Sequence, residues 1–344
     1  MIYPERLKEN NIIGITAPSN GLLKDAKIIA LEKAIANLNK YGFRVCESDN
    51  VRKSINGASS NAQHRAKSFM EYITNKDVKC IIAATGGDFL VEILEYINFE
   101  DILKNVKWVQ GQSDITALLY ILTTGMDIAT VYSYNITGFG YKNLHESQIN
   151  NIKVLKGDFV NQHSFDLFED PNDKKIKETP SMDLSLKTCW KAIGDVRYVK
   201  FRGRIIGGCL DSLLDIVGTK YDYTRNFINK YKMESIIWYF DVSDLTNEDI
   251  LRGLWQLKNA GWFQNTSGIM FGRLKNEVNY TGISLHEAIS RAIKSKNIPI
   301  LTDVDLGHTN PKITIINGAI ANVEYSDGKG NINFRIRKIG RAHV

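Results

Sequence analysis

The chain has 344 residues, of which 43% are hydrophobic and 24% are charged, and its formal net charge is +6 at pH 7. This length exceeds the roughly 250–300 residues at which a single core usually stops growing, so it predicts two domains. The lysines and arginines are spread along the sequence instead of gathering with aromatics in one stretch, which argues against nucleic-acid binding. No apolar signal core or membrane-length apolar run is present, so we expect a cytoplasmic protein without a membrane segment.

The four cysteines are widely spaced and form no CxxC pair; they are Cys46, Cys80, Cys189 and Cys209. This spacing argues against a structural zinc site and a disulfide scaffold. We expect no metal and no other cofactor. Cys80 lies in an apolar run and is expected to be a buried free thiol. The last five residues, 340–344, look unrelated to the preceding strand, and we assign them no function.

The first half of the chain alternates apolar strands with helices, which is typical of a parallel sheet covered on both faces. The first expected elements are a strand over Ile12 to Thr16 and a helix that has Ile28, Leu31, Ile35 and Leu38 on one face and closes at Gly42. A helix over about Asn61 to Thr74, a strand over Lys79 to Ala84 and a helix over Phe89 to Tyr96 follow. The last three are a strand over Lys107 to Gln110, a helix over Ile115 to Leu122 and a strand over Ile128 to Tyr132. Ligands of such sheets bind at the carboxyl ends of the strands, where the turns 85–88 and 111–114 are expected.

Residues 160–197 lose this alternation and are expected to link the first lobe to an α+β second lobe that starts near Phe201. The expected elements of that lobe are a strand over Gly203 to Leu210, a helix over Leu210 to Val217, a strand over Ile236 to Phe240, a helix over Asn247 to Ala260, a strand over Ile269 to Phe271, a helix over Ser284 to Ser295 and strands near Pro299 and Ile313. The predicted boundaries are 1–165 for the first domain, 166–198 for the linker and 199–340 for the second domain. A site between two lobes is a common arrangement in enzymes.

Ser113 is the candidate nucleophile, because it lies in a tight strand-to-helix turn that can present a hydroxyl above the sheet. Ile115 stands where the second glycine of a GxSxG elbow would be, which argues against an unrelated α/β-hydrolase esterase. The alternative is that Ser113 caps the following helix. The turn of Gly86, Gly87 and Asp88 also precedes a helix and suits an oxyanion hole or an anion site, with helix capping by Asp88 as the alternative.

His308 has the most constrained surroundings of the six histidines, because it lies on a stiff loop between Gly307 and Pro311, just after an apolar strand. The other five histidines lie in polar surroundings and are expected to be solvated; they are His64, His145, His163, His286 and His343. Asp241 ends the apolar strand 236–240 and can orient a histidine. The residues alone leave open whether Asp241 or Asp244 has this role.

Taken together, several segments resemble one family of serine peptidases, which includes the LD-carboxypeptidases of murein recycling and the microcin C immunity peptidases. These segments are 14–19, 84–87, 111–118, 206–210, 238–244 and 303–311, so the resemblance extends from about Ile12 to Glu324. It implies an α/β fold, with a flavodoxin-like parallel-sheet N-terminal domain, a smaller β-rich α+β C-terminal domain and the active site between them. It also suggests a homodimer.

The resemblance implies a catalytic triad of Ser113, His308 and an acid, with Asp241 standing where the family usually has glutamate. Gly86 and Gly87 would shape the oxyanion hole, and backbone amides of Asp88 and Asp114 would be its donors. Trp190 lies in the region that resembles a substrate-specificity loop of the immunity branch, where it could stack on a nucleobase. A hydrophobic plug between the lobes is the alternative for this tryptophan.

The expected reaction is amide hydrolysis through an acyl-enzyme, with a murein tetrapeptide losing its terminal D-alanine as the first substrate. An aminoacyl-sulfamoyl or aminoacyl-phosphoramidate adenosine is the alternative, since segment 240–262 looks closer to the immunity branch. A hypothesis of another class is a non-catalytic small-molecule binding protein, in which Ser113 and Asp88 merely cap helices.

Overall fold

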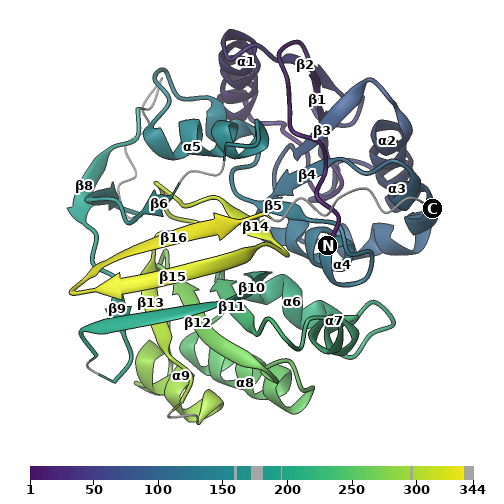
Figure 1. Cartoon of the computed structure of the whole chain (residues 1–344). Coiled ribbons are helices and arrows are strands. Elements are labelled where there is room, and N and C mark those ends of the chain that lie inside the picture. Colours follow the sequence, from purple (N-terminus) through teal and green to yellow (C-terminus); the bar gives the residue numbers. More distant parts are fainter. Residues whose placement is uncertain (159–160, 172–180, 195, 295–296, 337–344) are drawn as a thin grey trace.

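The computed structural model describes residues 1–158, 161–171, 181–194, 196–294 and 297–336. Two sheets, each flanked by helices, lie next to each other, with the first half of the chain around one sheet and most of the second half around the other (Figure 1). The predicted two-lobed α/β architecture is confirmed. The final residues 337–344, including His343, lie outside the described part of the chain.

The first sheet contains five parallel strands from the first half of the chain, four of which were expected, in the spatial order β2-β1-β3-β4-β5. Their bounds are β1 Ile12–Thr16, β2 Arg44–Glu47, β3 Val78–Ala83, β4 Trp108–Gly111 and β5 Thr130–Tyr132. This order is that of flavodoxin-like folds. Strand β2 was not predicted, because it is a short edge strand without an apolar run.

Helices cover both faces of this sheet (Figure 1), as continuous apolar strands require. They are α1 Asp25–Lys40, α2 Ala62–Thr74, η1 Leu90–Tyr96, α3 Phe99–Lys104, η2 Ser113–Ile115, α4 Thr116–Thr124, η3 Ile136–Phe139 and α5 Glu146–Leu155. The helix predicted after the Gly86-Gly87 turn is a 3₁₀ helix, and its N-cap residue is Phe89, whose side chain makes no capping hydrogen bond. Capping of this helix by Asp88 was therefore the wrong alternative.

The second sheet has the order β6-β16-β15-β10-β11-β12-β13-β9, with β10 to β13 parallel. Its strands are β6 Gln162–His163, β9 Lys191–Ala192, β10 Tyr198–Cys209, β11 Ile236–Asp241, β12 Thr266–Gly272, β13 Ile300–Val304, β15 Ile320–Ser326 and β16 Lys329–Arg335. Its helices are α6 Leu210–Ile216, α7 Thr224–Lys230, α8 Asn247–Asn259 and α9 Leu285–Ile293. The hairpin of β15 and β16 was not predicted, because its alternating pattern contains no continuous apolar run.

The segment expected to be a linker contains ordered strands. Strands β7 Leu167–Glu169 and β8 Leu184–Lys187 pair in a two-stranded sheet, and β9 adds to the edge of the second sheet. In the opposite direction, β14 Ile315–Asn317 leaves the second half of the chain and pairs antiparallel with β5. The two sheets are therefore joined by strands as well as by the connecting segment.

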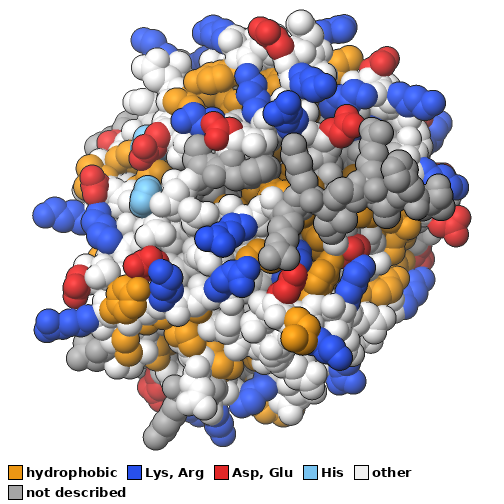
Figure 2. Space-filling model, in the orientation of Figure 1, with side chains coloured by type: hydrophobic (Ala, Val, Ile, Leu, Met, Phe, Trp, Pro, Cys, Tyr) orange, Lys and Arg blue, Asp and Glu red, His pale blue; other side chains and the backbone are white. Residues whose placement is uncertain are grey.

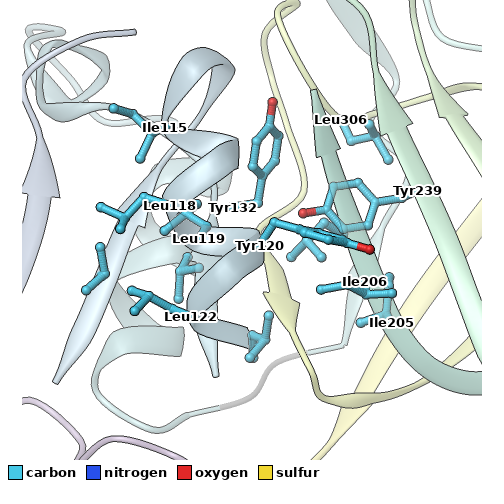
Figure 3. Packing of buried hydrophobic residues seen from close by; sticks show 14 of the residues in the cluster. Ile115, Leu118, Leu119, Tyr120, Leu122, Tyr132, Ile205, Ile206, Tyr239 and Leu306 are labelled. Carbon is cyan, nitrogen blue, oxygen red and sulfur yellow. The ribbon is translucent and has the colours of Figure 1, made fainter. Parts of the chain in front are cut away.

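Helix α4 lies between the two units, and all nine of its residues are buried. Figure 3 shows Leu118, Leu119 and Leu122 on this helix, with Ile205 and Ile206 of the second unit nearby. Tyr120 stacks on Trp262 of the second unit, with ring centroids 5.0 Å apart. A helix that is apolar on every side must be covered on every side, so α4 belongs to a core that both units share.

The surface in Figure 2 carries lysine and arginine side chains scattered among acidic ones, without one continuous basic patch on the face shown. Among the helices of the described residues, none has both the length and the apolar character needed to cross a membrane.

Candidate active site

Ser113 follows β4 at the carboxyl edge of the first sheet and has a left-handed backbone, with φ of +65°. A residue other than glycine rarely adopts this conformation, and strained residues of this kind are held in place by their surroundings. The backbone amide of Ser113 donates a hydrogen bond to the hydroxyl of Tyr132 at 3.2 Å. Gln112 and Ile115, not Ser113, occupy the N-cap positions of η2 and α4. This geometry supports the hypothesis that Ser113 presents its hydroxyl to the site, and it argues against a role of Ser113 as a helix cap.

Gly86 packs directly against Ser113. A Cβ atom at position 86 would lie 2.8 Å from Ser113 Cβ, 3.0 Å from Ser113 Oγ and 3.6 Å from the amide nitrogen of Asp114. Glycine therefore keeps open the space in front of the serine hydroxyl and beside the Asp114 amide. This is the place where an oxyanion donor would have to act.

The side chain of Asp114 joins the two predicted turns. Its Oδ2 atom accepts hydrogen bonds from the Ser19 hydroxyl and from the Leu90 amide, the latter at 2.9 Å. Burial raises the pKa of Asp114, and these hydrogen bonds partly oppose the rise. Asp88 has an exposed side chain, so only its backbone can belong to the site as predicted.

Asp241 and His308 meet between the carboxyl end of β11 and the loop after β13. His308 Nδ1 lies 2.8 Å from Asp241 Oδ2, and the His308 amide donates to Asp241 Oδ1 at 3.2 Å. The two side chains therefore form a close ion pair when His308 is protonated. Asp244 is exposed, and its amide donates to Asp211 instead. Of the two candidate acids, Asp241 is therefore the one that contacts His308.

Gly307 lets the loop approach the carboxylate. Its φ is +93°, and a Cβ atom there would collide with Asp241 Oδ1. Burial by itself would raise the pKa of Asp241, but His308, Tyr132 and Lys312 together outweigh burial, and the pKa is lowered. Burial likewise would lower the pKa of His308, but Asp241 outweighs it, and the pKa is raised. The two shifts describe one stabilised carboxylate–imidazolium pair.

Tyr132 is a functional candidate that the sequence did not single out. It ends β5 and is fully enclosed, with 2% of its surface exposed. Its hydroxyl donates to Asp241 Oδ2 at 2.5 Å and accepts the Ser113 amide. One side chain therefore connects the backbone of the candidate nucleophile with the carboxylate that contacts His308. Its position at the carboxyl end of a strand is the signal that could have identified it.

Lys312 is a second residue that the sequence analysis missed. It is buried, and its Nζ donates to Oε1 of Gln112, the residue before Ser113, at 2.6 Å. Burial lowers the pKa of Lys312 to about 8. Its positive charge contributes to the lowered pKa of Asp241 and also lowers the pKa of His308.

Trp190 is fully buried, and its indole N–H donates to Asp305 Oδ2 at 2.8 Å. Asp305 also forms a buried ion pair with Arg273. Tight packing of the indole against Gly330 leaves no free ring face on that side. This environment leaves little room for the stacking surface. The contacts with Asp305 and Gly330 make Trp190 a support of the loop that carries His308.

The other described histidines have partners outside this cluster. His64 pairs with Asp49, His145 caps α5, and His286 contacts Thr302. His163 is exposed and contacts Asn161. The structure thus brings Asp241 and His308 together and connects them to Ser113 through Tyr132.

The fold defines the class of a two-domain α/β protein, and comparison with known proteins gives the family. The LD-carboxypeptidase N-terminal domain matches residues 13–133, and the LD-carboxypeptidase C-terminal domain matches residues 202–323. The chain therefore belongs to the LD-carboxypeptidase family, peptidase family S66, as its resemblance to that family predicted.

Relatives with two kinds of names cover most of the chain. A Vibrio cholerae protein named as a carboxypeptidase is 27% identical over 95% of this chain and 96% of its own length. The microcin C7 self-immunity protein MccF of Escherichia coli is 26% identical over 86% of this chain and 85% of its own. A Bacillus subtilis protein named as a murein peptide carboxypeptidase is 24% identical over 92% of this chain and 90% of its own.

Solved structures share the whole fold. A MccF-like protein from Bacillus anthracis superposes with a TM-score of 0.81 at 23% identity, covering 98% of this chain and 100% of the other. MccF in complex with aspartyl sulfamoyl adenosine superposes with a TM-score of 0.82 at 22% identity, covering 98% and 99%. These likenesses establish the two-domain architecture.

Proposed function

We propose that this serine peptidase hydrolyses an amide bond through an acyl-enzyme, with Ser113 as nucleophile, His308 as general base and acid, and Asp241 as the orienting acid. The observation that carries the proposal is the contact of Asp241 with His308, together with the Tyr132 bridge from Asp241 to the Ser113 amide. A nucleophile, a base and an orienting carboxylate are the parts that such a reaction needs.

In the proposed reaction, His308 removes the Ser113 proton, and Oγ attacks the substrate carbonyl carbon. Backbone amides of Asp88 and Asp114 stabilise the oxyanion in the space that Gly86 leaves open. Asp241 stabilises the positive charge that His308 gains with the Ser113 proton, and His308 then gives this proton to the leaving amine. Water, activated by His308, releases the acyl group and restores Ser113.

For the substrate, we propose a murein tetrapeptide that loses its terminal D-alanine. The relative named as a murein peptide carboxypeptidase supports this choice. The second candidate is an aminoacyl-nucleotide analogue, supported by the similarity to MccF, whose structures include complexes with aspartyl sulfamoyl adenosine and adenosine monophosphate. The buried state of Trp190 gives no additional support to nucleobase stacking.

The test is mass-spectrometric detection of product after incubation with a murein tetrapeptide or an aspartyl-sulfamoyl adenosine. Ser113→Ala and Asp241→Asn should lose most activity, whereas Asp244→Asn, an exposed carboxylate on the same loop, should keep it. Release of D-alanine supports the carboxypeptidase, and cleavage of only the nucleotide supports the immunity-type hydrolase.

Cleavage that persists in Ser113→Ala contradicts the proposed nucleophile. If neither compound is cut, a simple ester series tests for an esterase, and ligand binding unaffected by Ser113→Ala would favour the non-catalytic binding protein. The cytoplasmic location and the homodimer stay predictions, and light scattering of the purified protein checks the second.

A further inference from the structure

Cys209 is a residue of the proposed active site that the proposed reaction does not use. It ends β10, directly beside Asp241 at the end of β11, because the two residues are register partners of adjacent parallel strands. Only 1% of its surface is exposed. Its free thiol donates to Asp211 Oδ2 at 3.3 Å.

The thiol forms a compact cluster with the proposed acid and base. The Cys209 Sγ, one carboxylate oxygen of Asp241 and one ring nitrogen of His308 all lie within 4.8 Å of one another. Among the described residues, no other group of three or more His, Cys, Asp or Glu side chains brings its ligand atoms this close together. His308 Nδ1 lies 2.8 Å from Asp241 Oδ2, so the imidazole and the carboxylate already stand next to each other in the cluster.

We propose that Cys209, Asp241 and His308 form an inhibitory site for a thiophilic divalent cation, with Zn²⁺ as the representative ion. Thiolate, imidazole and carboxylate are the ligands that zinc takes in proteins, at about 2.0–2.3 Å. Such bond lengths bring tetrahedral ligand atoms to about 3.3–3.8 Å from one another, so a small side-chain adjustment suffices.

The charges around the cluster favour such an ion. The carboxylates of Asp241 and Asp211 both lie beside the Cys209 thiol, so a cation at the cluster would meet negative charge on two sides. A cation binds by displacing the thiol proton to solvent, and the new positive charge offsets the thiolate and the two carboxylates. The Lys312 ammonium opposes binding, since its charge reaches both Asp241 and His308.

Zinc at this site would stop the proposed reaction without any covalent change. When His308 binds the metal, its pair with Asp241 is lost. It can then no longer accept the Ser113 proton. His308 has 18% of its side chain exposed, so the approach to the cluster lies on the histidine side. Removal of the ion by a chelator restores the resting arrangement.

The proposed metal site depends on the Cys209, Asp241 and His308 side chains and not on the identity of the substrate. Metal binding therefore tests it as well as activity does. Co²⁺ added to the metal-free protein should produce a thiolate-to-cobalt charge-transfer band. Zn²⁺ affinity, measured by competition with a chromophoric chelator, should fall at least about tenfold in Cys209→Ala and Cys209→Ser. Cys80→Ala, a buried thiol elsewhere, and Cys189→Ala, an exposed one, should bind Zn²⁺ like the unmodified protein.

Zn²⁺ should also inhibit hydrolysis reversibly in the unmodified protein and much less in the two Cys209 variants, whereas Mg²⁺ should not inhibit. The serine variant covers the case in which alanine leaves a cavity that impairs folding. Absence of the charge-transfer band in the unmodified protein overturns the proposal. So does an unchanged Zn²⁺ affinity in folded Cys209 variants, because the thiol would then not be a ligand.

Discussion

Tyr132 determines how the nucleophile and the acid are held relative to each other. Its hydroxyl is the donor in the contact with Asp241 Oδ2 and the acceptor in the contact with the Ser113 amide, so it uses both of its hydrogen-bonding capacities. Burial and the nearby Asp241 charge raise its pKa well above the usual range, which keeps the hydroxyl protonated for this donation. Tyr132 is therefore a positioning residue for the strained turn and for the carboxylate.

Tyr132→Phe should fold normally and lose activity. Removing a hydroxyl that bonds to a charged group costs about 1.5–3 kcal/mol, which corresponds to about a 10- to 100-fold loss of kcat/KM. The matched control is Tyr239→Phe, because the Tyr239 ring lies 5.5 Å from the Tyr132 ring while its hydroxyl bonds to Asn317. Equal activity losses in the two variants would show that the hydroxyl of Tyr132 has no special role.

The pH dependence of the reaction reports on His308. The proposed base must be neutral, so kcat/KM should fall as the pH drops through the pKa of His308. Because the pKa of His308 is raised, this acidic limb should lie above the ordinary histidine value of about 6.5. Lys312 lowers the pKa of His308, so Lys312→Met should move the limb to higher pH.

The control for this profile is Lys329→Met, which removes an exposed lysine that pairs with Asp166. Its acidic limb should coincide with that of the unmodified protein. A limb that moves to lower pH in Lys312→Met would contradict the electrostatic role assigned to this lysine.

At the scale of elements, the site depends on the loop that follows β13. Trp190 and Arg273 hold the loop through Asp305, and Gly307 lets it pass over Asp241. In this arrangement Asp241 Oδ2 lies 2.8 Å from His308 Nδ1. The contact between Asp241 and His308 therefore depends both on the loop after β13 and on the end of β11.

Gly307→Ala should damage this fit. Its left-handed φ adds strain of about 1–3 kcal/mol, and the new Cβ displaces either the loop or Asp241. A displacement of this kind should lower kcat by about 100-fold. Gly194→Ala is the control, because its φ is +97° and its Cβ would meet nothing within 4 Å. Comparable kcat values for the two variants would show that the collision with Asp241 does not lower activity. Thermal unfolding of both variants separates a loss of kcat from a general loss of stability.

At the scale of the whole molecule, the two domains that match the family are joined by elements that belong to both. The matched ranges 13–133 and 202–323 are separate in sequence. Strand β14, however, comes from the second range and completes the first sheet beside β5, and α4 is covered by both units. The proposed site lies at this junction, since Ser113 and Tyr132 come from one unit, and Asp241 and His308 come from the other.

A fragment of residues 1–158 should therefore fail to fold cooperatively. It lacks β14, which leaves the β5 edge open, and it exposes the faces of α4 that the second unit covers. Denaturant unfolding followed by circular dichroism checks this, with the full chain as the reference. A sharp transition of the isolated fragment, similar to that of the full chain, would show that the first unit is independent of the second.

The sequence by itself predicted the parallel first sheet and the turn that carries Ser113, because buried strands and their turns leave local patterns of apolar residues and glycines. Resemblance across several segments added the family, His308 and a role for Asp241. The β15–β16 hairpin was missed, because its alternating pattern contains no continuous apolar run. The choice of Asp241 over Asp244, the Tyr132 bridge, the buried Trp190 and the Cys209 cluster depended on tertiary structure. Each of these depends on contacts between residues that lie far apart in the chain or in adjacent strands, and such contacts leave no local pattern.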